Sequence, residues 1–72
     1  MNDNEKKKLE IAELYPVLLS FPVFVKYFDI KSDKLLDEKI SVLKQLKDGK
    51  QISDIANFYD IFELLPDDAH YD

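Results

Sequence analysis

The chain has 72 residues, no cysteine and a formal net charge of −5 at neutral pH. A chain of this length folds as one domain, here residues 1–72 with fraying expected at 1–3 and 67–72. The absence of cysteine excludes disulfide bonds and thiolate metal sites, so packing alone must hold a small core. A hydrophobic content of 46% argues against intrinsic disorder. One glycine and three prolines are too few for the turns of a many-stranded β protein, which favours helices.

Charge is distributed unevenly along the chain. Residues 1–50 contain ten lysines and nine acidic residues, whereas residues 51–72 contain six acidic residues and no lysine. Arginine, which grips phosphate and carboxylate groups in a bidentate manner, is absent throughout. The C-terminal third therefore repels nucleic acid and anionic membranes and attracts a basic protein surface. We expect no direct binding of nucleic acid or membrane.

The longest uncharged run extends from Leu14 to Val25 and contains two prolines. It is too short to cross a membrane, which takes about 20 residues. A secretory signal also fits poorly, because acidic residues interrupt the region where basic and apolar stretches would stand. Together with the absence of cysteine, these features predict a cytoplasmic protein.

Two prolines divide the first thirty residues into separate segments. Apolar residues at helical spacing predict a helix from about Asn4 to Tyr15. Pro16 lacks an amide hydrogen and its ring clashes with the preceding turn, so that helix stops or kinks there. Pro22 suits the first position of a short second helix that runs to about Asp29. A strand is the rival interpretation of this second segment, because its Val, Phe and Tyr residues favour strands.

The clearest predicted helix lies between residues 33 and 49. Ser32 or Asp33 can cap its start. Gly49 ends it, because glycine adopts the left-handed conformation of a helix C-terminus without penalty. A core-facing stripe runs along this helix and consists of Leu36, Ile40, Leu43 and Leu46, broadened by Leu35 and Val42.

A last helix is expected to begin after Ser53, its N-cap, and to run to about Leu65. Apolar side chains recur in it at spacings of three and four, namely Ile55, Phe58, Tyr59, Phe62 and Leu65. Only a narrow polar strip remains, so this helix needs cover on most sides, which so small a chain scarcely provides. The sequence as a whole thus predicts an all-α fold, a bundle of three to four short helices with a flexible acidic C-terminal tail.

The segment from Leu43 to Ile61 resembles the opening half of a helix-turn-helix DNA-binding unit. A glycine-containing turn precedes a helix with an Ile–Ala pair, Ile55 and Ala56, as in that family. The resemblance implies a helical hairpin followed by a recognition helix. Where the recognition helix should begin, however, the chain has acidic residues and Pro66 instead of Arg, Lys, Asn or Gln. A degenerate helix-turn-helix transcriptional regulator is therefore one alternative function.

Metal binding and catalysis find little support in the sequence. Asp67, Asp68, His70 and Asp72 are of types that bind metals, but they follow Pro66 in a predicted tail and match no calcium-binding loop. The only histidine lies near the C-terminus, and a single glycine cannot build a phosphate-binding loop. We expect no enzymatic activity, no cofactor and no bound metal.

Aromatic and acidic residues are interleaved after Gly49, as in many protein-binding segments. Aromatic rings bury a large area at low entropic cost, and acidic groups steer a basic partner into register. The same rings at helical spacing also suit a core, so both interpretations stay open. Partner contacts are predicted at Tyr59, Phe62, Glu63, Asp67, Asp68 and Tyr71.

The predicted function is a non-enzymatic protein-binding or regulatory module, whose partner is another protein with a basic surface. A second alternative, beside the helix-turn-helix regulator, is an acidic inhibitor that imitates nucleic acid and blocks a DNA-binding protein. The chain is also a candidate homodimer, because an uncovered apolar helix can be buried against a second copy of itself.

Overall fold

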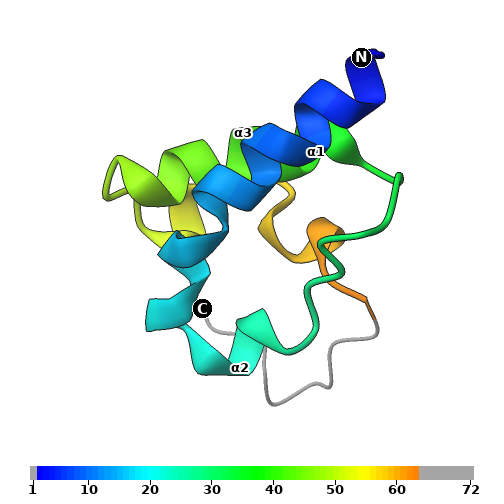
Figure 1. The fold of residues 1–72 in the computed structure, drawn as a ribbon. Coiled ribbons are helices and arrows are strands. Elements are labelled where there is room, and N and C mark those ends of the chain that lie inside the picture. Colours follow the sequence, from blue (N-terminus) through cyan, green and yellow to red (C-terminus); the bar gives the residue numbers. More distant parts are fainter. Residues whose placement is uncertain (1, 64–72) are drawn as a thin grey trace.

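The computed structural model describes residues 2–63, and these residues form helices and turns without any strand (Figure 1). The predicted all-α fold is therefore confirmed. The α-helices and the 3₁₀-helices follow one another along the chain as α1 (Asp3–Leu14), η1 (Tyr15–Ser20), α2 (Pro22–Val25), α3 (Leu36–Lys47), η2 (Ile52–Asp54) and η3 (Phe58–Ile61).

The first helix has the end that the proline predicts. The side chain of Asn2 caps α1 by accepting a hydrogen bond of 2.8 Å from the amide of Glu5. Pro16 cannot donate to the preceding turn, and the α-helix gives way at Tyr15 to the tighter η1. The chain changes direction where α1 gives way to η1, so the two elements follow one another at an angle (Figure 1).

The second α-helix is shorter than predicted. It begins at Pro22, as expected, but ends at Val25 and not near Asp29. Phe21 separates it from η1 with a non-helical backbone conformation (φ −128°, ψ 72°), and the carbonyl oxygen of Phe21 accepts hydrogen bonds from the amides of Phe24 and Val25. The strand alternative for this segment is wrong.

The start of α3 differs from the sequence prediction. Neither Ser32 nor Asp33 caps it; the N-cap is Leu35, in the left-handed conformation with φ of 53° and with no side-chain capping bond. The Ser32 hydroxyl instead accepts a hydrogen bond from the amide of Lys34, and Asp33 pairs with Lys8 of α1. The two polar side chains therefore shape the approach to the helix and do not begin it.

The segment after Gly49 is the main departure from the predicted fold. In place of a single helix from Ser53 to Leu65, residues 51–63 form two short 3₁₀-helices, interrupted by an extended Ile55 and a left-handed Asn57. Side chains at intervals of three lie on one face of a 3₁₀-helix. The buried residues of this segment have that spacing at Ile55, Phe58 and Ile61. Core packing thus overrides the α-helical pattern.

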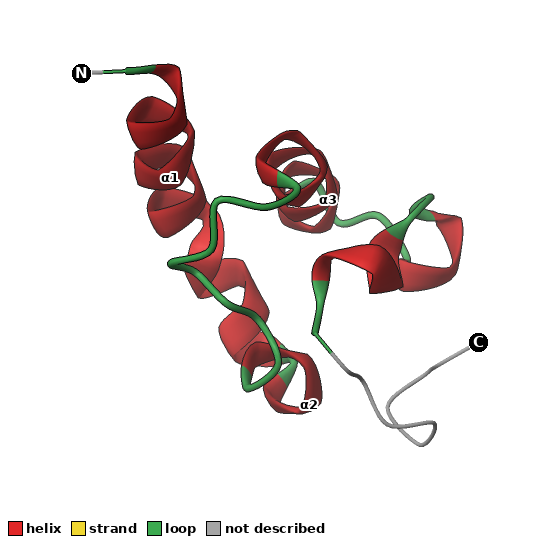
Figure 2. Cartoon of the chain, turned by 90° about the vertical axis from the view of Figure 1, so that its right-hand side faces the viewer, coloured by secondary structure: helices red, strands yellow, loops and turns green. Residues whose placement is uncertain are grey.

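The elements enclose one apolar core. Helix α3 packs against α1 on one side and against η3 on the other, while η1 and α2 lie along the edge (Figure 2). The buried hydrophobic residues come from every element except η2: Ile11, Leu14, Leu18, Phe24, Phe28, Leu36, Val42, Leu43, Leu46, Ile55, Phe58, Ile61 and Phe62.

Ion pairs also join the first and third α-helices. Lys7 binds Asp37 at 3.0 Å, and Lys44 binds Glu10 at 2.9 Å. All four side chains are well exposed, so each pair adds only about 0–1 kcal/mol.

Gly49 provides the first test. It has φ of +88°, and a Cβ atom added there would meet no other atom within 4 Å. A methyl group at this position would therefore strain the backbone without causing a steric clash. Gly49→Ala should lower the free energy of unfolding by about 1 kcal/mol, measured by chemical denaturation. Gly49→Asn, which tolerates this conformation better, should lose less. Equal stability of wild type and Gly49→Ala would contradict the assigned helix end.

Candidate functional site

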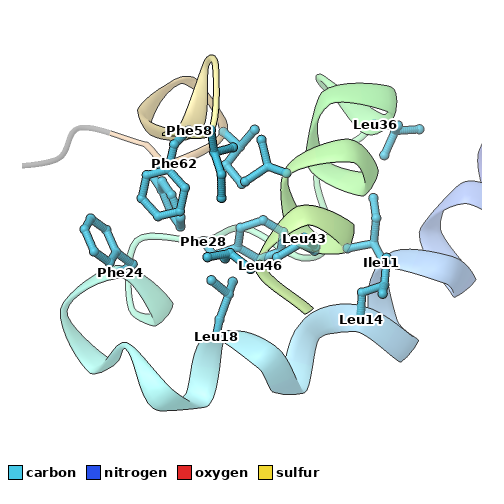
Figure 3. Close-up of a cluster of buried hydrophobic side chains, with 13 residues drawn as sticks. Ile11, Leu14, Leu18, Phe24, Phe28, Leu36, Leu43, Leu46, Phe58 and Phe62 are labelled. Carbon is cyan, nitrogen blue, oxygen red and sulfur yellow. The ribbon is translucent and has the colours of Figure 1, made fainter. Parts of the chain in front are cut away.

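Two aromatic residues of the predicted binding segment, Phe58 and Phe62, point into the core. Phe58 and Phe62 are 2% and 7% exposed, and they face the same interior as Phe28 and Leu43 (Figure 3). The ring centroids of Phe24 and Phe58 are 5.0 Å apart in an edge-to-face arrangement. Phe62, predicted as a contact residue, is thus packed mainly in the core, and its contact with a partner stays a prediction.

The other predicted contact residues divide into three groups. Tyr59 is partly buried and packs with its ring edge-to-face on Phe58, at 5.2 Å between centroids. Glu63 is exposed, and its amide donates a hydrogen bond of 3.0 Å to the carbonyl oxygen of Tyr27. The remaining predicted contacts, Asp67, Asp68 and Tyr71, lie outside the described residues.

The outward surface of residues 51–63 is acidic. Its charged residues are Asp54, Asp60 and Glu63, all exposed, and the last lysine along the chain is Lys50. Within residues 2–63, every ion pair lies elsewhere, between α1 and α3 or between α1 and the approach to α3. Lys26 lines one depression with Glu63, and Lys34 and Lys39 line another with Asp60 and Glu63. We call Asp54, Asp60 and Glu63 the acidic face.

An apolar depression lies beside η2. It has a volume of about 280 Å³ and is lined by Ser20, Phe21, Pro22, Val23, Phe24 and Ile52. A second depression of about 380 Å³ shares Phe21 and Ile52 with it. Leu19, next to the first depression along the chain, is 62% exposed. No charged side chain lines the first depression, which we call the Phe21 groove.

Lys39 is the one charged residue that is buried among residues 2–63, with 4% of its surface exposed. Its ammonium group donates a hydrogen bond of 3.2 Å to the carbonyl oxygen of Asp29. The same group lies 5.5 Å from the centroid of the Phe28 ring. Lys39 thereby ties α3 to the loop between α2 and α3.

Burial sets the protonation behaviour of this lysine. Loss of solvent lowers the pKa of Lys39 below its ordinary value of 10.5, because the ammonium form loses hydration. The carboxylates of Asp29, Glu63 and Asp33 act in the opposite direction, while the positive charge of Lys8 adds to the lowering. The net direction is downward, so the folded state disfavours the charged lysine.

In the described part of the chain, the structure contains neither the helical hairpin that the resemblance implies nor a group of metal-binding residues. Residues 50–63 contain no α-helix, so the second helix of the hairpin that the resemblance implies is missing. Residues 2–63 contain no group of three or more His, Cys, Asp or Glu arranged to hold a metal ion. His70 and its neighbouring acids lie outside this range. None of the helices within it is long and apolar enough to cross a membrane.

No protein-family model matches this chain, and comparisons with curated proteins and with solved structures found no match.

Two features of the surface and core have signals in the sequence that point to them. All residues of the Phe21 groove except Ile52 belong to the longest uncharged run. This run is too short to cross a membrane but can form an apolar patch on the surface. Lys39 stands three residues after Leu36 and four before Leu43, on the apolar stripe of α3. A lysine flanked in this way by two core positions shares their side of the helix and is buried with them.

Lys39 gives a prediction about stability and pH. Because its pKa in the folded state lies below the unfolded value, the cost of charging it is fully present at neutral pH and is lost as the pH rises towards 10.5. Lys39→Met removes the buried charge with little change in volume. This variant should have a higher free energy of unfolding than the wild type at neutral pH, with a smaller difference in alkaline solution.

Lys47→Met, at an exposed position on the same helix, is the matched control and should change stability little. Chemical denaturation at several pH values measures all three proteins. Lower stability of Lys39→Met at neutral pH would mean that the contacts with Asp29 and Phe28 outweigh the desolvation of the ammonium group.

Proposed function

We propose that this chain is a non-enzymatic protein-binding module that recognises a basic surface of another protein through its acidic face. The observation that carries the proposal is that Asp54, Asp60 and Glu63 are exposed on a segment without any lysine. Elsewhere in the domain, by contrast, lysines and acids pair across α1 and α3. A field of one sign steers a partner of the other sign and repels polyanions.

The segment that bears the acidic face is anchored in the core. Ile55, Phe58 and Ile61 are the buried side chains that hold it there. The carboxylates are therefore presented by a segment that does not have to fold on binding, which lowers the entropic cost of recognition. Such a surface suits a regulatory contact that depends on charge and on salt concentration.

The experiment compares two variants with the same net charge. The test variant carries Asp54→Asn, Asp60→Asn and Glu63→Gln; the control carries Glu13→Gln, Glu38→Gln and Asp48→Asn. Each set removes three negative charges, which changes the net charge from −5 to −2. All six positions are exposed and outside the ion pairs of residues 2–63, so both variants should fold.

The two variants and the wild type are used to capture proteins from a lysate of the native host, at low and at high salt. The wild type and the control should retain the same proteins at low salt, whereas the test variant should lose them. Equal retention by both variants, or no protein retained specifically by the wild type, would contradict the proposal. A truncation after Gly49 is unsuitable, because it removes part of the core.

The same exposed carboxylates also suit imitation of nucleic acid. In that case, the captured partner is a DNA-binding protein, and duplex DNA should displace it from the wild-type chain. Retention of the partner in excess DNA would remove this second function and leave general recognition of a basic protein.

A further inference from the structure

We propose that the Phe21 groove and the depression beside it together bind a small amphiphilic carboxylate, a fatty acid of medium chain length. The alkyl chain lies in the groove, and the carboxylate pairs with Lys50. This site is separate from the acidic face, so the inference goes beyond the proposed function and does not depend on it.

The Phe21 groove supplies the apolar half of the site. Five of its six lining residues are apolar, and Ser20 is the sixth. The amide of Phe21 donates to the carbonyl oxygen of Leu18 at 2.8 Å, and Pro22 has no amide hydrogen. The turn therefore exposes apolar side chains without leaving these two backbone positions short of a hydrogen bond. An alkyl chain placed there gains free energy in proportion to the apolar area that it covers.

The adjoining depression supplies the polar half of the site. It shares Phe21 and Ile52 with the groove, so the two depressions meet along these side chains. Its other lining residues are Leu46, Gly49, Lys50, Gln51 and Ser53. Within residues 2–63, Lys50 is the only charged residue that lines either depression, and no acidic residue does so. The local charge of the site is therefore positive.

The end of α3 holds Lys50 in this place. Gly49 has φ of +88°, and its amide donates to the carbonyl oxygen of Leu46 at 3.0 Å. The amide of Lys50 donates to the carbonyl oxygen of Gln45, also at 3.0 Å. The ammonium group of Lys50 has three N–H groups, and the side-chain oxygen of Gln45 accepts from it at 3.0 Å. A carboxylate can accept from the same group, in a charge-assisted bond that is stronger than a neutral one.

The sizes of the two depressions suit a small molecule. Their volumes are about 280 Å³ and 380 Å³, near the lower end of the range of roughly 300–1,000 Å³ that is usual for small-molecule sites. Such sites are mostly apolar, with a few polar groups that fix the orientation of the ligand. Here these groups belong to Lys50, Ser20 and Ser53. A single negative group on an apolar chain matches this lining.

Charge outside the two depressions disfavours larger anionic ligands. Asp48 and Asp54 are exposed and stand next to lining residues in the chain. An acidic peptide, a nucleic acid or an anionic membrane would extend over them and meet charge of the same sign. A second copy of the chain would bring its own net charge of −5. A ligand with one negative group stays beside Lys50, and its apolar chain supplies most of the affinity.

The test titrates the full chain, isotopically labelled, with octanoate below the concentration at which it forms micelles. Octyltrimethylammonium has an apolar chain of similar length with a positive head group, and acetate has the carboxylate without the chain. Octanoate should shift the methyl signals of Val23 and Ile52 and the amide signal of Lys50 in NMR spectra. Acetate should shift none of them, and octyltrimethylammonium should bind about fivefold more weakly than octanoate.

Substitutions at Lys50 test the polar half of the site. Lys50→Gln removes the charge from an exposed side chain and should weaken octanoate binding about fivefold. Lys6→Gln is the matched control, because it changes the net charge equally at an exposed lysine of α1 outside the ion pairs of residues 2–63. It should leave the affinity for octanoate unchanged.

Substitutions in the groove test the apolar half. Val23→Thr places a hydroxyl group in the groove at nearly constant shape and should also weaken octanoate binding about fivefold. Pro22→Ser, at an exposed lining position, should act in the same direction and keeps the test valid if Val23→Thr fails to fold.

The proposal is overturned if octanoate shifts none of these signals, or if Lys50→Gln and the groove variants bind it as well as the wild type. Equal binding of octyltrimethylammonium would show that the site does not select a negative head group. If dilution of the chain alone moves the signals of Val23 and Ile52, a second copy covers the groove and the fatty acid is not its ligand. None of these results bears on the acidic face, whose carboxylates lie outside both depressions.

Discussion

The contact between aromatic rings from the two halves of the chain is the constraint on which this structure depends. Phe24 of α2 meets Phe58 and Phe62 at 5.0 Å and 5.2 Å between ring centroids, and Phe28 meets Phe62 at 6.0 Å. A small domain without disulfides has little stability to spare, and aromatic residues bury the largest area per side chain. These rings close the core that α1 and α3 leave open at one end.

The closure also decides what the surface can do. Because Phe58 and Phe62 face inward, the segment after Gly49 presents its carboxylates and not its phenylalanine rings to solvent. The exposed apolar surface then comes from a different place, the turn around Phe21. The acidic part and the apolar part of the surface meet at η2, which contributes Ile52 to one and Asp54 to the other.

The sequence predicted the elements that local rules control and missed those that the tertiary structure controls. Pro16 and Gly49 end their helices as expected, because each acts through its own backbone geometry. The predicted cap of α3 was wrong, because Asp33 is paired with Lys8 across the structure. The predicted last helix was also wrong, since Asn57 takes the left-handed conformation that lets Ile55 and the following rings reach the core.

The candidate site was predictable only in part, because its geometry also depends on tertiary contacts. The acidity of the last third is visible in the composition, and the exposure of Glu63 fits it. Spacing alone could not tell whether Phe62 faces a partner or the core, because both need apolar rings at regular intervals. The Phe21 groove combines residues 20–24 with Ile52, and no local pattern brings these two segments together.

Native-state hydrogen exchange tests the aromatic closure most directly. The amide of Glu63 bonds to the carbonyl oxygen of Tyr27, which joins the last described residue to the loop after α2. If the rings seal the core, this amide should exchange only when the whole domain unfolds, at the rate of the amide of Leu43 in the middle of α3. Fast exchange at Glu63 while Leu43 stays protected would show that the C-terminal segment opens by itself, and it would contradict the closure of the core by these rings.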